Sequence, residues 1–139
     1  MKAEITLDET IRSILTEYNR VAVVGVSDNP ARASHNIAKY LINQGFTVIP
    51  VNPGLPEFFG LRCYPDLLSA PGPIEIVDIF RRVEFIPEIV DQAIKIGAKA
   101  VWMQSGLVDE ASAERARSAG LKVVMDHCIM VEHRSRFRS

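Results

Sequence analysis

Hydrophobic positions along the chain follow two alternating patterns. Short apolar runs rich in β-branched residues, without polar alternation, are typical of strands in a parallel sheet covered on both faces. These runs cover residues 21–26, 46–51, 74–80, 100–104 and 121–125. Between them, apolar residues recur every three or four positions, which predicts amphipathic helices. The predicted helices cover residues 8–18, 34–43, 88–96 and 109–118, and a glycine closes each of the last three.

This alternation of strands and helices predicts an α/β fold. We expect a Rossmann-like, doubly wound and mainly parallel sheet of five strands with helices on both faces, because right-handed crossovers leave few other topologies. A length of 139 residues predicts one domain spanning 1–139, which is long enough for a single buried core.

Short polar side chains predict how the first two helices begin. Thr6 or Asp8 is expected to cap the first helix, and Ser34 or a neighbour the second. The stretch 55–70 is predicted to be a loop that contains one short strand, over 61–64, and one helical turn.

Composition and charge narrow the class of protein. Hydrophobic residues make up 47% and charged residues 24%, and the formal net charge of −1 argues against a general nucleic-acid binder. The basic tail 134–138 is predicted to be a loose terminus. No apolar run approaches the roughly 20 residues that span a bilayer, and residues 1–8 lack the apolar core of a signal peptide. Two cysteines, Cys63 and Cys128, suit a reducing compartment, so we expect a cytoplasmic protein.

The first apolar run leads into a candidate phosphate-binding turn. Gly25 lets the backbone turn sharply and approach a ligand, and the helix that follows presents amides and a positive dipole end to an anion. The dinucleotide fingerprint Gly-x-Gly-x-x-Gly is kept only at its first position, because Ser27 and Pro30 occupy the other two. The turn therefore predicts a nucleotide pyrophosphate site but not an ordinary NAD site.

The second strand ends Val51-Asn52-Pro53, without the carboxylate that holds a ribose diol. The absence of that acid favours a phosphorylated ribose, for which the planar guanidinium of Arg32 is a suitable cation. NADP and coenzyme A both carry a ribose phosphate, and these observations do not separate them.

Several short phrases are spread over nearly the whole chain. They are Val24-Gly25-Val26-Ser27 with Arg32 and His35, the runs 45–53, 76–81, 97–104 and 120–128, Glu57 with Gly60, and Glu132-His133. Together they resemble the small CoA-binding domain family, whose stand-alone proteins are similar to the N-terminal Rossmann domain of the succinyl-CoA ligase alpha subunit. The chain departs from the family at His127, where arginine is more common.

The resemblance implies a coenzyme A molecule across the carboxyl edge of the sheet. The residues implied are Gly25, Ser27 and Arg32 at the phosphates, Val51, Asn52 and Pro53 at the adenosine end, Phe80, Arg81, Gln104, Ser105 and Gly106 along the pantetheine arm, and Cys128 within reach of the CoA thiol. Cys128 is expected either to pack inertly or to form a mixed disulfide with CoA. Gln104 ends a strand and needs a hydrogen-bond partner, which a ligand amide could supply.

No nucleophile, base and acid constellation, Gly-x-Ser-x-Gly elbow or Walker lysine occurs in the sequence. The phosphorylated histidine of the ligase alpha subunit lies in a second domain, which we do not expect here. We therefore predict a non-catalytic module that binds CoA or an acyl-CoA. We expect it to bind no metal, no nucleic acid and no membrane. An NADP-dependent oxidoreductase, with His127 as general acid, and an interaction subunit without ligand are the alternatives. The sequence leaves open whether the ligand is free CoA or an acyl-CoA. It also leaves open whether the protein forms a homo-oligomer or has a partner subunit.

Overall fold

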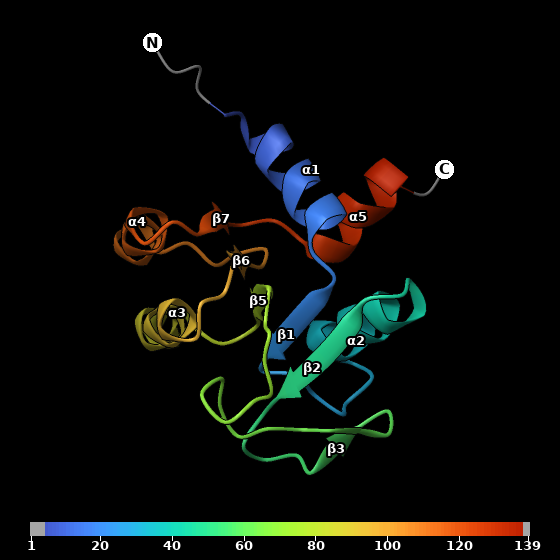
Figure 1. Cartoon of the computed structure of the whole chain (residues 1–139). Helices are drawn as coiled ribbons and strands as arrows, with labels where there is room; N and C mark the ends of the chain where they lie inside the picture. Colours follow the sequence, from blue (N-terminus) through green and yellow to red (C-terminus); the bar gives the residue numbers. More distant parts are fainter. Residues whose placement is uncertain (1–4, 138–139) are drawn as a thin grey trace.

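The five-stranded sheet predicted from the apolar runs is present. The structure is a computed structural model that describes residues 5–137 (Figure 1). The strands of this sheet all pair in parallel, in the order β2-β1-β5-β6-β7. They are β1 (Arg20–Val24), β2 (Thr47–Val51), β5 (Ile76–Ile79), β6 (Ala100–Met103) and β7 (Lys122–Val124). This confirms the α/β, Rossmann-like fold class.

Helices cover both faces of this sheet (Figure 1). One face carries α1 (Leu7–Glu17), α2 (Ala33–Asn43) and α5 (Ile129–Phe137), and the other carries α3 (Ile86–Lys95) and α4 (Glu110–Ser118). No helix within residues 5–137 is long and apolar enough to cross a bilayer.

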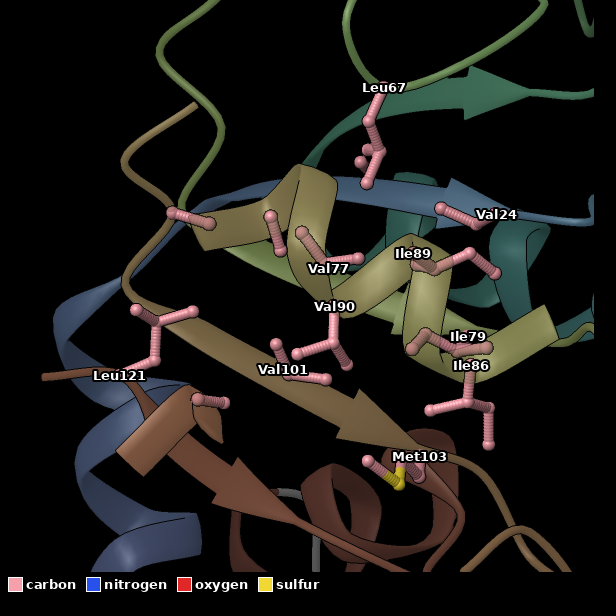
Figure 2. Close-up of a cluster of buried hydrophobic side chains, with 14 of the residues drawn as sticks. Val24, Leu67, Val77, Ile79, Ile86, Ile89, Val90, Val101, Met103 and Leu121 are labelled. Atoms are coloured by element: carbon pink, nitrogen blue, oxygen red, sulfur yellow. The ribbon is translucent and has the colours of Figure 1, made fainter. Parts of the chain in front are cut away.

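Two hydrophobic clusters lie on the two faces of the sheet. Figure 2 shows Val77 and Ile79 of β5 beside Ile86 and Val90 of α3 in one of them. On the opposite face, Trp102 is fully buried among residues from α1, α2 and α5. Burial from both sides is the reason that the strands are continuous apolar runs rather than alternating ones.

The two predicted helix caps have different outcomes. Thr6 caps α1 through a complete capping box: its hydroxyl accepts from the backbone N–H of Glu9, whose carboxylate accepts from the N–H of Thr6. At α2 the prediction of a Ser34 cap is wrong. Arg32 is the N-cap residue, and no side chain among the described residues makes a capping hydrogen bond to the start of this helix. The first amides of α2 are therefore free to meet a ligand.

The predicted loop 55–70 contains a small antiparallel hairpin. Its strands are β3 (Glu57–Phe58) and β4 (Leu61–Arg62), so the expected strand over 61–64 is shorter and has a partner that the sequence did not indicate. Phe59 and Gly60 form its turn, both with positive φ. Phenylalanine is an unusual residue in that conformation, which hides the hairpin from sequence patterns.

The prediction of a loose basic tail is wrong over most of its length. Residues 134–137 belong to α5, and Ile129 at its start is fully buried. Arg136 bonds to Glu132 one turn earlier and to Asp8 of α1, which ties the end of the chain to its beginning. Residues 1–4, the first part of the stretch 1–8, and residues 138–139 lie outside the described residues.

Candidate ligand-binding site

The carboxyl end of the sheet holds two adjoining cavities. The helix after β1 (α2) covers one face and the helix after β5 (α3) covers the other, so the strand order reverses between these two neighbouring strands. Loops diverge at such a switch point and leave a crevice between them, which is where ligands bind in open α/β sheets.

The first cavity has a volume of about 580 Å³ and lies between the loops after β1 and β5 and the start of α2. Six of the predicted site residues line it: Gly25, Ser27, Arg32, Asn52, Phe80 and Arg81. Arg82, which sequence analysis did not assign to the site, lines it as well. The structure thus brings together residues separated by more than fifty positions in the sequence.

Gly25 shapes this cavity by its conformation and by the absence of a side chain. Its φ is +93°, and its N–H donates to the carbonyl oxygen of Val51 at 2.9 Å. A Cβ here would lie 3.0 Å from Cδ of Arg81 and 3.3 Å from the backbone carbon of Phe80. Any larger residue would therefore need both a strained backbone and a shift of Arg81.

The first cavity is electropositive. The exposed Arg32 stands at the uncapped start of α2, and Arg81 and Arg82 follow β5 on the opposite wall. The guanidinium of Arg81 stacks 4.2 Å from the ring centre of Phe85, while Arg82 pairs with Glu84 on the surface. Three guanidinium groups and the amides of a helix N-terminus suit an anionic ligand.

Hydrogen bonds order the loop after β1. Ser27 Oγ accepts from the backbone N–H of Asn29, and its carbonyl oxygen lies 3.0 Å from Nδ1 of His35. Asn52 Nδ2 donates to the carbonyl oxygen of Val26 at 2.6 Å, while Asn52 Oδ1 accepts from the N–H of Gly54. The amide nitrogen of Asn52 thus joins the loops after β1 and β2, and its amide oxygen orders the loop after β2.

The second cavity continues from the first toward β6 and has a volume of about 340 Å³. The two share Ala33, Phe80, Arg81 and Arg82, so they form one groove. Its predicted site residues are Phe80, Arg81, Gln104, Ser105 and Cys128, and its further walls are Ile37 and Leu107. Cys128 is a half-buried free thiol. This part of the groove is more apolar than the first and suits an uncharged chain.

Gln104 already has a partner within the protein. Its Nε2 donates to Oδ1 of Asp78 at 2.5 Å, and both residues are buried. Oδ2 of Asp78 has no hydrogen-bond partner within the described part of the chain. Burial raises the pKa of Asp78 to about 8, with the Gln104 hydrogen bond opposing the shift. Sequence analysis did not assign Asp78 to the site, although an acid inside the apolar run 74–80 was a signal for it.

The remaining predicted residues lie at the margins of the groove. Val51 and Pro53 line a third cavity of about 190 Å³, which Arg81 also borders. Gly106 lies in the loop after β6 and lines none of these three cavities. Its N–H donates to Oδ1 of Asp126 at 2.6 Å, which joins the loops after β6 and β7.

The doubly wound sheet and the cationic groove at its switch point define a Rossmann-like binding domain. A family model described as CoA binding domain matches residues 19–134. The chain belongs to this family of CoA-binding domains, which confirms the resemblance seen in its sequence.

Relatives include both small proteins and large ligases. The chain is 40% identical to YneT of Bacillus subtilis (strain 168) over 123 residues, 88% of this chain and 91% of that protein. It is 31% identical over 116 residues, 80% of its own length, to acetate–CoA ligase [ADP-forming] II of Archaeoglobus fulgidus, but covers only 17% of that ligase. A structure from Pyrococcus horikoshii OT3 superposes with a TM-score of 0.89 at 41% identity, covering 97% of this chain and 98% of that one.

Proposed function

We propose that the groove binds coenzyme A or an acyl-CoA, with the phosphates in the first cavity and the pantetheine arm in the second. The observation that carries this proposal is the polarity of the groove, which is cationic at the start of α2 and mainly apolar toward Cys128. Coenzyme A has the same polarity, with three phosphates at one end and an uncharged arm at the other. Membership of the CoA-binding domain family supports it.

Arg32 is proposed to hold the ribose phosphate, and Gly25 and Ser27 to admit the pyrophosphate close to the backbone. Arg32 is exposed at the cavity wall, and its planar fork matches phosphate oxygens. The turn at Gly25 leaves no side chain between the ligand and the amides.

The adenosine is proposed to lie beside the loop after β2. The amide nitrogen and the amide oxygen of Asn52 each bond to the backbone of the loops after β1 and β2, so we assign Asn52 the role of positioning that backbone. Val51 and Pro53 offer apolar surface on the side of the third cavity. Their contact with the base would be by packing rather than by polar recognition.

The pantetheine arm is proposed to pass Phe80 and Arg81 and to run along Gln104 and Ser105 in the second cavity, toward Gly106 in the same loop but outside the cavity. Its thiol would end near Cys128, which borders the second cavity. We propose a binding module without catalysis of its own. The family match gives no support to an NADP-dependent oxidoreductase. We also propose a cytoplasmic protein, because both cysteines are free thiols.

Isothermal titration with CoA, dephospho-CoA and NADP tests the proposal. CoA should bind more tightly than the other two. Arg32→Ala should lower CoA affinity at least about tenfold, the effect of losing a charge-assisted hydrogen bond, and should change dephospho-CoA affinity much less. Arg117→Ala, at an exposed arginine of α4, is the matched control and should bind CoA as the wild type does. Binding of none of the three would overturn the proposal and favour an interaction subunit.

A further inference from the structure

Asp78 lies beneath the second cavity at the centre of the sheet. Its register neighbours are Val23 of β1 and Trp102 of β6. Side chains alternate along a strand, and Val77 and Ile79 point toward α3 (Figure 2). The carboxyl group of Asp78 therefore lies on the opposite face, where α2 and Gln104 border the second cavity.

The hydrogen bond to Asp78 determines which end of the Gln104 amide is available. Because the hydrogen bond fixes Nε2 toward Asp78, the carbonyl oxygen Oε1 lies at the other end of the amide and is the acceptor that Gln104 can offer to the second cavity. Gln104 is only 5% exposed, and a carbonyl oxygen in such a place needs a donor. Ile37, Phe80 and Leu107 of the cavity wall carry no polar donor. Of the polar wall residues, Arg81 stacks on Phe85, Arg82 pairs with Glu84, and Ser105 is exposed, so a bound ligand is the natural source of that donor.

We propose that Asp78 is a positioning residue, which holds Gln104 so that its carbonyl oxygen accepts a hydrogen bond from an amide N–H of the pantetheine arm. This inference rests on the proposed function. Pantetheine carries two secondary amides and no charge, which suits an acceptor in an apolar cavity. Asp78 would thus give the second cavity a preference for amide donors without touching the ligand.

The protonation state of Asp78 is compatible with this role. Its carboxyl group is fully buried with one oxygen unpartnered, and burial raises its pKa to about 8. At neutral pH it is therefore mostly uncharged and places little negative charge near the phosphates of the ligand. A neutral carboxyl still accepts from Gln104 through its carbonyl oxygen.

Two ligands separate this role from a general effect on the fold. Coenzyme A contains the pantetheine arm, whereas adenosine 3′,5′-bisphosphate retains the phosphorylated adenosine and lacks the arm. Asp78→Val should lower the affinity for CoA about fivefold to tenfold, as expected for one lost hydrogen bond, and leave the affinity for adenosine 3′,5′-bisphosphate unchanged. Asp78→Asn, which keeps an acceptor for Gln104, should bind both ligands as the wild type does.

A double-mutant cycle with Gln104→Leu tests whether Asp78 acts through Gln104. The double variant should bind CoA no more weakly than Gln104→Leu alone, because both changes remove the same contact. Equal weakening of both ligands by Asp78→Val, unchanged CoA affinity in that variant, or additive losses would each overturn the inference. A wild-type protein that binds neither ligand would instead overturn the proposed function.

Discussion

Gly25 is the residue on which the shape of the first cavity depends most directly. We expect Gly25→Ala to destabilise the protein by about 1–2 kcal/mol, because its φ of +93° is strained for any residue with a Cβ. The new methyl group should also displace Arg81, only 3.0 Å away, and so weaken CoA binding. Denaturant unfolding and calorimetric titration measure the two effects.

Gly120 provides the matched control, since it has the same φ of +93° and nothing lies within 4 Å of the position that a methyl group would take there. Gly120→Ala should therefore lose a similar amount of stability and keep the wild-type affinity for CoA. Equal CoA affinities for the two variants would show that the contact between Gly25 and Arg81 does not shape the ligand site.

The C-terminal helix α5 is the element for which sequence and structure differ most. Its apolar positions do not form a clear stripe, and its basic residues suggested a solvated tail. The helix is held by distant partners instead: Ile129 is buried in the cluster on the α1 and α2 face, and Arg136 reaches Asp8. Tertiary packing rather than local pattern thus stabilises this helix.

This packing predicts that α5 unfolds together with the sheet. Ile129→Ala should lower the free energy of unfolding by about 2–5 kcal/mol, since it removes a fully buried side chain. Val131→Ala, on the same helix but 44% exposed, should change it by about 0.5 kcal/mol or less. Chemical denaturation followed by circular dichroism measures both. Equal small effects would mean that α5 is not part of the cooperative unit.

The stability of the whole molecule should depend on pH through Asp78. Its pKa is raised to about 8 in the folded protein from an ordinary value near 3.8, because burial disfavours its charged form. The folded state therefore holds a proton that the unfolded chain releases between these values. Stability is highest at low pH for this group and falls as pH rises toward 8, by at most about 1.4 kcal/mol per pH unit.

Asp78→Asn cannot titrate, so its free energy of unfolding should lack this decline between about pH 5 and 8. Urea unfolding at several pH values measures the difference, and parallel curves for the two proteins would contradict it. Glu114→Gln, at an exposed carboxyl group of α4, is the matched control for the loss of a carboxyl group and should keep the decline. Below about pH 5, Glu75 makes the free energy of unfolding depend on pH with the opposite sign. Backbone N–H groups of Asn19 and Arg20 lower its pKa, so its contribution is lost in acid.

Local pattern predicted most of the fold and much of the groove. The apolar runs located all five strands of the sheet. Residues at or just after the ends of these runs supplied Gly25, Ser27 and Arg32 in the first cavity and Gln104 and Cys128 in the second. Strand ends in a parallel sheet meet at one edge, so these positions could be inferred without coordinates. Their roles toward a ligand stay predictions.

Features that depend on distant contacts were not predictable in this way. The partner of Gln104 is Asp78, which lies 26 positions earlier in the chain and on a neighbouring strand. In the sequence it is a single acid within an apolar run, and only the sheet register shows which face it occupies. The hairpin turn at Phe59 was not predicted for a local reason, because phenylalanine is rarely found at positive φ.

The sequence by itself determined the fold class, the order of the five sheet strands and the first four helices, and the turn that follows β1, because each depends on local periodicity and backbone conformation. Tertiary structure decided which loops share the groove, what holds Gln104, and that the chain ends in a packed helix. These outcomes depend on the strand order β2-β1-β5-β6-β7 and on burial between residues far apart in the sequence. Such burial is a property of the assembled sheet, and no short stretch of the chain encodes it.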